Sequence, residues 1–590
     1  MSFFAKHAGV SKPHLFCEPA AVGVEPSKRF DYIIAGGGTA GCVLASRLTE
    51  DPNVSVLVIE AGESDQKQLM SKIPAGWGNL WKTPAEWDFE TVPQEHANGR
   101  ALYQPRGKML GGCSAINAAC YQHCSPSDYD NWEAMGAQGW GYNSLKPYFR
   151  KAELFTPHPD HAIDGQHRGA EGPWQTSYPP SNELTSAFLK AGTAIGIPHN
   201  PDLNVETNTT GITRFQCHVD SQGQRSSTSS AYIPSSVASR PNLSILTGTT
   251  CTRLLFSSSS STEEPTCIGV EVAQTRDGPR WIVGAKKEVL LCLGAFGTPQ
   301  LLLASGVGDK EELEKVGVKS TVQLEGVGKG LRDHVLSTCV WKAKKGSSLQ
   351  FLTNPVATLP ALARWLWDGK GALSTNLAEG GAFLRSDAIP GQESTIAKGS
   401  TNASGPTSPD LEVILAPLYY VHHGLEKPPS ADDFLTLAPT VLRPYSRGQV
   451  TISSGSTFDK PVIDPKYFSD ERDLTVLLEG VKLARRIARS APLSGFLLES
   501  VTPPNLDTLD DVEILAHIRA TADTIYHPMS TAAIGAREDG GVIDSELKVH
   551  GVHGLRVCDA SVFPDSVSGH PVAAVVAVAE KFADMLKGQV

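Results

Sequence analysis

The chain has few charged side chains, no excess of positive charge and no long apolar run. Charged residues make up 19% of its 590 residues, and 63 acidic against 52 basic side chains give a formal net charge of −11. Without a basic excess there is no overall field to hold a nucleic-acid backbone, so we expect no nucleic-acid partner. The longest apolar runs, such as residues 572–579, fall far short of the roughly 20 residues that a membrane-spanning helix needs, so we expect no membrane partner. With 40% hydrophobic residues, the composition is that of an ordinary folded protein.

Cysteine is scarce and scattered. Eleven cysteines, an odd number, are spread from Cys17 to Cys558 and do not make the dense disulfide framework of a small secreted domain. Cys113, Cys120 and Cys124 are close together, but neither the adjacent His123 nor a second cysteine pair completes a zinc pattern, so no metal site is predicted. Residues 1–28 are interpreted as an irregular N-terminal extension without a secretory signal, and the C-terminal Lys-Gly-Gln-Val is not a peroxisomal address. We expect an intracellular, cytoplasmic protein, and the sequence leaves its oligomeric state open.

A βαβ unit is predicted near the start of the chain. Strand-like apolar runs occur at residues 30–35 (FDYIIA), 54–59 (VSVLVI), 287–292 (KEVLLC) and 555–558 (LRVC). The first two runs flank residues 39–48, whose apolar positions have helical spacing, so these two strands should be parallel. Near-continuous apolarity is typical of a sheet buried on both faces, and the two later runs are interpreted as returns to this sheet. The predicted fold class is therefore α/β.

The turn between the first strand and its helix has the pattern of a dinucleotide site. Gly36, Gly38 and Gly41 form G-x-G-x-x-G in the strand-turn-helix context in which the motif has physical meaning. The first glycine permits the turn, the second lets a pyrophosphate approach the backbone, and the third lets helix and strand pack closely. Glu60 ends the second strand, where a carboxylate can accept hydrogen bonds from both ribose hydroxyls. The alternative is a plain glycine turn with Glu60 as a solvated strand end, and the unit alone does not distinguish NAD from FAD.

The later part of the chain is predicted to be α+β. Residues 257–265 and 386–409 are rich in Ser, Thr, Gly and Pro and are interpreted as surface loops. Alternating apolar and polar residues around Val450 and Ile452 predict a half-buried antiparallel strand. Residues 474–487 repeat apolar positions at helical spacing.

Two segments resemble the signatures of a known family. Residues 107–117 (GKMLGGCSAIN) and 294–308 (GAFGTPQLLLASGVG) are similar to the two signatures of the glucose-methanol-choline (GMC) oxidoreductases. Supporting segments follow in the expected order at residues 32–41, 105–106, 225–232 (RSSTSSAY), 328–334 (GKGLRDH), 444–448 and 559–571. The resemblance covers residues 30–586 and implies a Rossmann-like FAD-binding domain interleaved with an α+β substrate domain built on an antiparallel sheet. We place the FAD-binding domain at residues 29–335 and 540–590 and the substrate-binding domain at 336–539.

The resemblance implies FAD as the cofactor and assigns residues to it. The expected contacts are Gly36, Gly38, Thr39, Ala40, Gly41, Glu60, Ala61, Gly107, Gly112, Ser114, Asn117, Ala118, Cys251, Asp559, Ala560, Pro571 and Val572. Ile116 stands where some relatives have a histidine that bonds covalently to the flavin. Because isoleucine has no nucleophilic atom, we expect a non-covalent FAD. Residues 572–586 read as a helix with Pro571 in its first turn, whose N-terminus would stabilise the anionic reduced flavin.

The resemblance also implies a catalytic pair of histidines. His527 lies in Tyr-His-Pro-Met-Ser-Thr and His570 in Ser-Gly-His-Pro-Val, which resemble the positions of the family's active-site pair. Met529 and Ser530 depart from the usual Val and Gly of the first motif. Neutral imidazole can accept the alcohol proton as hydride leaves for flavin N5. We assign His527 as general base and His570 as the group that hydrogen-bonds the alcohol oxygen, although the two roles could be shared or exchanged.

The predicted function is oxidation of the CH–OH group of an alcohol, with O2 or another electron acceptor reoxidising FAD. The alternatives are a non-redox lyase or cyclase of the same fold with structural FAD, and a non-catalytic flavoprotein. Residues 336–442 are expected to roof the pocket. They contain several aromatic residues that could face either the core or the ligand, with the core expected for most: Trp341, Phe351, Trp365, Trp367, Tyr419 and Tyr420.

Overall fold

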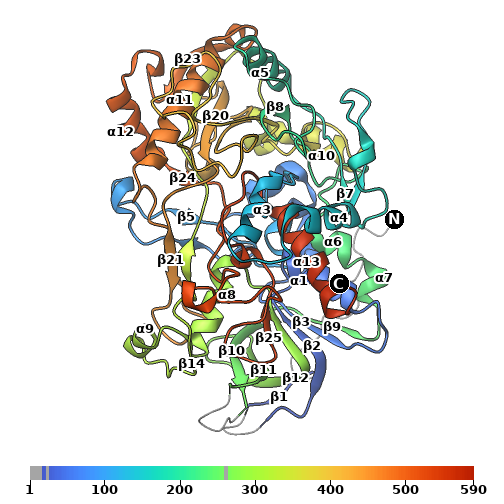
Figure 1. The fold of residues 1–590 in the computed structure, drawn as a ribbon. Helices are drawn as coiled ribbons and strands as arrows, with labels where there is room; N and C mark the ends of the chain where they lie inside the picture. Colours follow the sequence, from blue (N-terminus) through green and yellow to red (C-terminus); the bar gives the residue numbers. More distant parts are fainter. Residues whose placement is uncertain (1–15, 21–24, 258–263) are drawn as a thin grey trace.

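The computed structural model describes residues 16–20, 25–257 and 264–590 and is built on two large sheets. Figure 1 shows them at opposite ends of the molecule, the first below and the second above. Among the described residues, none of the helices has the length and apolar character that crossing a bilayer would require.

The first sheet has a parallel core. Its strands run in the order β10-β11-β12-β2-β3-β9, with β25 and β1 also paired to β12. Five strands are mutually parallel where they pair: β2 (Arg29–Ala35), β3 (Val56–Ile59), β9 (Leu243–Leu246), β12 (Trp281–Leu291) and β25 (Leu555–Val557). Strands β10 (Thr250–Phe256) and β11 (Cys267–Ala273) extend it antiparallel. The four strands predicted from apolar runs thus join one sheet, as expected, although β12 begins several residues earlier.

Helices pack on this sheet, and the first of them begins at the glycine-rich turn that follows β2. The helix α1 (Thr39–Leu48) follows the turn, and its residues are mostly buried. It packs against α13 (Val572–Leu586), which matches the predicted C-terminal helix, with Pro571 at its N-cap. Arg47 Nη2 lies 2.7 Å from Oε1 of the fully buried Glu580, so a charged pair ties the two helices together.

The second sheet is antiparallel. Its order is β23-β17-β20-β19-β18-β8, with β16 and β24 attached to one side. Its strands are β8 (Gly211–Arg214), β16 (Val335–Leu336), β17 (Cys339–Ala343), β18 (Gly380–Leu384), β19 (Leu411–Ala416), β20 (Asp433–Val441), β23 (Leu497–Thr502) and β24 (Asp523–Thr524). β8 lies within residues 29–335, the range predicted for the FAD-binding domain, and pairs with β18 at the end of this sheet.

One face of the second sheet packs on a long helix. Leu411, Val413 and Leu415 alternate along β19 and share an apolar core with α11 (Arg472–Arg489), which contains the helix predicted at residues 474–487. Because side chains alternate along a strand, Glu412, Ile414 and Ala416 point to the opposite face. That face is turned toward the site described below.

The other elements are short. The remaining helices are α2 (Leu69–Lys72), α3 (Pro126–Ala134), α4 (Tyr142–Ala152), α5 (Glu183–Ala194), α6 (Thr228–Tyr232), α7 (Ser235–Ala238), α8 (Gly294–Ala304), α9 (Lys310–Lys315), α10 (Pro355–Asp368) and α12 (Asp511–Thr521). Small sheets are formed by β4 (Phe89–Glu90) with β5 (Tyr103–Gln104), β6 (Glu153–Phe155) with β7 (Trp174–Thr176), β13 (Val307–Gly308) with β14 (Val322–Gln323), and β15 (Lys329–Leu331), β21 (Gly448–Thr451) and β22 (Val462–Asp464) together.

Three local predictions have mixed outcomes. The strand expected around Val450 is β21, antiparallel to both neighbours, as predicted. Residues 386–409 contain no helix or strand and are mostly exposed or half-buried, so this segment is a surface loop, as predicted, with buried residues such as Ser386 and Ser408 near its ends. The N-terminal extension is not wholly irregular, because β1 (Glu18–Pro19) pairs with β12. Residues 1–15, 21–24 and 258–263 lie outside the described residues.

Candidate functional site

One cavity runs from the glycine-rich turn to the two histidines. At one end it is lined by Gly36, Gly38 and Glu60, and at the other by His527 and His570. All the predicted cofactor contacts line it except two. The sequence therefore brings segments from across the whole chain to a single space, which joins the predicted nucleotide site to the predicted catalytic pair.

The glycine-rich turn has the features of a pyrophosphate cradle. A Cβ added to Gly41 would lie 2.0 Å from the Gly36 carbonyl oxygen, so only glycine permits this packing of helix on strand. This close contact accounts for Gly41, which does not line the cavity. Gly38 is the N-cap of α1 and makes no side-chain cap, so the first-turn N–H groups are available to an anion. These features fit the phosphates of a dinucleotide.

Glu60 is buried and holds the turn. Its Oε2 accepts a hydrogen bond from the Gly37 N–H at 3.0 Å, and its Oε1 accepts one from the Gly62 N–H at 2.8 Å. The side chain is 6% exposed, which excludes a solvated strand end, and burial raises the pKa of its carboxyl. Each carboxylate oxygen can accept a second bond, so the predicted ribose contacts are compatible with this role.

The first signature segment forms a tight helical turn against the cavity. In the 3-10 helix Gly112–Ala115, Ser114 points away from the cavity, because its Oγ donates to the Gly111 carbonyl at 2.6 Å and accepts from the Thr228 N–H at 2.9 Å. Ser114 thus holds the segment in place. Ile116 lines the cavity next to it.

Asn117 and Asp559 anchor the segments around the cavity. Asn117 Oδ1 accepts from Arg225 Nη1 at 2.8 Å. One oxygen of Asp559 accepts from the Gly294 N–H at 2.9 Å and from Thr298 Oγ1 at 2.6 Å, at the start of α8. Burial raises the pKa of the Asp559 carboxyl. Asp559 therefore links the C-terminal strand to the second signature segment.

The two predicted catalytic histidines face each other. The centroids of the His527 and His570 rings are 5.0 Å apart, and the rings are nearly perpendicular. The backbone N–H of His527 donates to Asp333 Oδ1 at 2.9 Å. The backbone N–H of His570 donates to Gln122 Oε1 at 3.2 Å, and α13 begins directly after Pro571. Burial, followed by the neighbouring His334, lowers the pKa of His527 well below its usual value, so its imidazole is neutral.

Two further side chains contact this pair and were not predicted. His334 Nδ1 lies 2.9 Å from His527 Nδ1, and Glu412 Oε1 lies 3.1 Å from His570 Nε2. Both are fully buried. The sequence held a signal for each, since His334 ends the segment GKGLRDH and Glu412 is a single carboxylate in the apolar run LEVILA.

An aromatic and apolar wall closes the histidine end of the cavity. The ring centroids of Trp77 and Trp81 are 5.0 Å apart, and those of Trp81 and Tyr526 are 5.1 Å apart. The predicted roof contributes apolar and neutral residues from the second sheet and its loops: Leu336, Leu377, Ala378, Ile414, Ala416, Leu418, Tyr420, Thr436 and Ala438. The tryptophans come from residues 74–81, a segment that sequence reasoning did not assign to the pocket.

The aromatic residues expected in the core divide into three groups. Trp341, Trp365 and Tyr419 are buried, as expected. Tyr420 instead lines the cavity. Phe351 and Trp367 are exposed, Trp367 to 88%.

Comparison with known proteins agrees with this geometry. Two protein-family models, both described as GMC oxidoreductase, match residues 30–336 and 444–579 of the chain. The chain is 39% identical to "Dehydrogenase str4" of Strobilurus tenacellus, with 99% of each chain covered, and 34% identical to "Alcohol dehydrogenase [acceptor]" of Pseudomonas putida, covering 94% of this chain and 95% of that one. Its fold superposes on formate oxidase of Aspergillus oryzae RIB40, in a structure concerned with FAD modification, with a TM-score of 0.85 at 28% identity, covering 96% of this chain and 99% of that one. The chain is therefore an enzyme of the GMC oxidoreductase family, with FAD as its cofactor and the mixed α/β fold of that family.

Proposed function

We propose that this enzyme oxidises the CH–OH group of an alcohol, with His527 as general base and His570 as the partner that binds the alcohol oxygen. The observation that carries the proposal is the pair of perpendicular imidazoles, 5.0 Å apart, in the same cavity as the glycine-rich turn. When bound, FAD supplies the flavin N5 that accepts the substrate hydride.

Each histidine is suited to a different part of the reaction. His527 is neutral and uses Nδ1 for His334, which leaves Nε2 for the substrate hydroxyl. His570 uses Nε2 for Glu412, which leaves Nδ1 for the same oxygen. The buried carboxylate of Glu412 stabilises positive charge on the His570 ring, and a positively charged ring is a strong donor to a developing alkoxide. Proton removal by one ring and charge stabilisation by the other both favour loss of hydride from the carbon.

The composition of the pocket wall favours an uncharged apolar or aromatic alcohol. The second sheet contributes Ile414, Ala416 and Ala438 to the cavity, and the residues it contributes from the described part of the chain carry no charge. A sugar would lose hydrogen bonds to water there without regaining them. A cationic alcohol would find no exposed carboxylate on the described part of this wall, because Glu412 is fully buried against His570. Trp81 and Tyr526 offer ring faces and edges to an aromatic substrate.

The test is anaerobic reduction of the bound flavin by a panel of alcohols. Benzyl alcohol, 1-hexanol, glucose and choline would be mixed with the FAD-loaded enzyme, and loss of the flavin absorbance followed by stopped flow. We expect the second-order rate constant of flavin reduction for benzyl alcohol and hexanol to be at least about tenfold above that for the other two, because about 1.4 kcal/mol of lost binding gives that ratio. Bleaching best by glucose or choline would contradict the substrate class, and no bleaching by any alcohol would favour a lyase or cyclase with structural FAD.

Oxidase and dehydrogenase differ only in the electron acceptor. Hydrogen peroxide produced during aerobic turnover would identify O2 as the acceptor, whereas reoxidation only by an added quinone or dye would identify a dehydrogenase. The domain boundaries at residues 335 and 540 and an intracellular location stay predictions. The location is supported by the eleven cysteines, all of which lie in the described residues and are free thiols.

A further inference from the structure

A third histidine lies behind the catalytic pair. His334 follows β15 in the connection to β16, is fully buried, and meets His527 with its ring at 82° and the two Nδ1 atoms 2.9 Å apart. Two facing nitrogens at this distance share one hydrogen, so one ring donates and the other accepts. Which ring donates decides which nitrogen of His527 can act as a base.

Ser566 determines the direction of this hydrogen bond. Its Oγ lies 2.9 Å from His334 Nε2 and donates to the Leu442 carbonyl at 2.9 Å. A hydroxyl has one hydrogen, and a carbonyl oxygen can only accept, so Ser566 must accept its second bond from His334 Nε2–H. A neutral His334 with hydrogen on Nε2 has its lone pair on Nδ1, and His527 must then donate Nδ1–H.

The surroundings keep both rings neutral. Burial, with His570 and Arg443 as further contributions, lowers the pKa of His334 to about 3. Burial, followed by His334, His570 and Arg106, lowers the pKa of His527. A protonated His334 would have no lone pair for His527, so its neutrality is needed for the chain of bonds.

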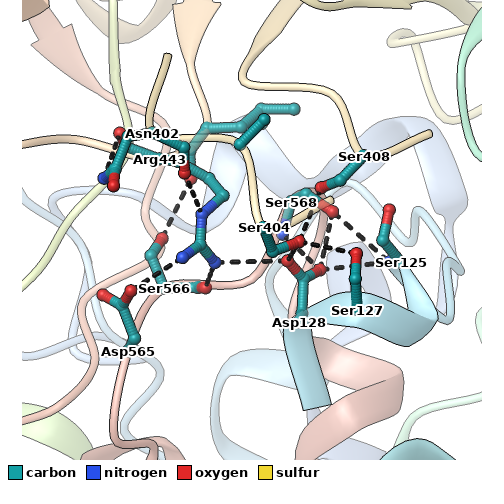
Figure 2. A network of polar contacts seen from close by, with 12 residues as sticks. Ser125, Ser127, Asp128, Asn402, Ser404, Ser408, Arg443, Asp565, Ser566 and Ser568 are labelled. Atoms are coloured by element: carbon teal, nitrogen blue, oxygen red, sulfur yellow. Dashed lines mark hydrogen bonds and ion pairs between the residues drawn. The ribbon is translucent and has the colours of Figure 1, made fainter. Parts of the chain in front are cut away.

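Ser566 is itself held by a buried polar network, shown in Figure 2. Arg443 donates through Nη1 to the Ser566 carbonyl and pairs through Nη2 with Asp565 Oδ2 at 2.7 Å. Two residues further on, the N–H of Ser568 donates to Asp128 at 2.8 Å. The segment that carries Ser566 is therefore anchored on both sides, and the position of its hydroxyl is defined.

We propose that His334, oriented by Ser566, is a positioning residue that holds His527 in the Nδ1–H tautomer, so that Nε2 carries the lone pair that takes the alcohol proton. The proposal rests on the function proposed above, in which His527 is the base. It adds a residue that does not touch substrate or cofactor and acts by choosing the reactive nitrogen.

The matched variants are His334→Leu and His334→Gln. Leucine fills the buried site but cannot accept from Nδ1–H, so His527 is free to adopt the wrong tautomer. We expect flavin reduction to slow by about 10²-fold, below the roughly 10⁴-fold loss known for a wrongly oriented catalytic histidine, with little change in the Kd of the alcohol. The amide oxygen of glutamine can accept the bond, so His334→Gln should reduce its flavin at least about tenfold faster than His334→Leu. Equal rates in the two variants, or a wild-type rate in His334→Leu, would overturn the proposal.

A measurement that does not need activity separates this proposal from the proposed function. In FAD-loaded enzyme labelled with ¹⁵N-histidine, the His527 signals are those missing from the spectrum of His527→Ala. We expect an unprotonated Nε2, coupled to the hydrogens on both ring carbons, and a protonated Nδ1. The opposite assignment would overturn the proposal even if the variants at position 334 do not fold. If the tautomer is as expected but no alcohol reduces the flavin, the proposed function fails and the positioning role stands.

Discussion

Arg443 at the centre of the buried network in Figure 2 should be a large contributor to stability. Arg443 is 2% exposed, and its side chain makes four polar contacts. Nε donates to the Asn402 carbonyl at 2.8 Å, Nη1 to the Ser566 carbonyl and to Asp128 Oδ1 at 3.2 Å, and Nη2 to Asp565 Oδ2 at 2.7 Å. We predict that Arg443→Met strongly lowers the free energy of unfolding.

The size of the loss in unfolding free energy depends on which partners Asp565 and Asp128 retain in the variant. Removing one partner of a buried ion pair costs about 3–5 kcal/mol, because the other charge is left uncompensated away from water. Asp565 still has Arg332 Nη2 at 2.8 Å, and Asp128 still accepts from Ser568 and other donors. We therefore expect the lower end of that range, about 3 kcal/mol.

The control is a salt bridge of the same type on the surface. Arg489 Nε lies 2.7 Å from Asp507 Oδ1, but the two side chains are 54% and 47% exposed. Such a pair contributes about 0–1 kcal/mol, because water solvates both charges once they are separated. Arg489→Met removes the same atoms as Arg443→Met and should change stability by no more than this.

The assay is urea unfolding at one saturating FAD concentration, since a ligand that binds only the folded state adds to the apparent stability. Far-ultraviolet circular dichroism and flavin fluorescence would report the midpoint, and the slope would convert midpoint shifts to free energies. If Arg443→Met shifts the midpoint no further than Arg489→Met, the network contributes nothing beyond a surface pair and the reasoning is wrong.

Two other predictions address the site, and a third addresses stability at low pH. Because Ile116 has no nucleophilic atom, acid precipitation should release all FAD to the supernatant, and flavin in the pellet would contradict this. His527→Ala should retain FAD but slow flavin reduction by about 10²- to 10⁴-fold, and a wild-type rate in stopped flow would refute the base assignment. The double variant with His570→Ala should lose less than the product of the two single losses, because both rings act on one proton. Burial raises the pKa of Asp523, but the facing His423 and His422 together outweigh burial and lower this pKa to about 2, so the contribution of Asp523 to stability is complete above about pH 4 and is lost as the pH falls through 2. Asp523→Asn should therefore differ from wild type in urea midpoint at pH 5 and converge on it below about pH 2, and a difference that does not shrink with acid would contradict the assignment.

Local patterns in the sequence were sufficient for the parallel half of the fold. The apolar runs, the glycine spacing and the helical periodicity of residues 39–48 depend on neighbours along the chain, so they predict β2, α1 and β3 without tertiary information. The same holds for α13, whose bounds agree with the predicted residues 572–586. The motif contexts of His527 and His570 were also local.

The environment of the histidines was decided only by the tertiary structure. His334 meets His527 across 193 positions in the sequence, and Glu412 meets His570 across 158. No periodicity encodes which face of β19 receives a carboxylate or which buried imidazole accepts a hydrogen, because these depend on how the two sheets pack around the cavity. The two histidines proposed as catalytic could therefore be named from their sequence motifs, whereas the residues proposed to act on the charge and tautomer of their rings could be placed beside them only once the chain was folded.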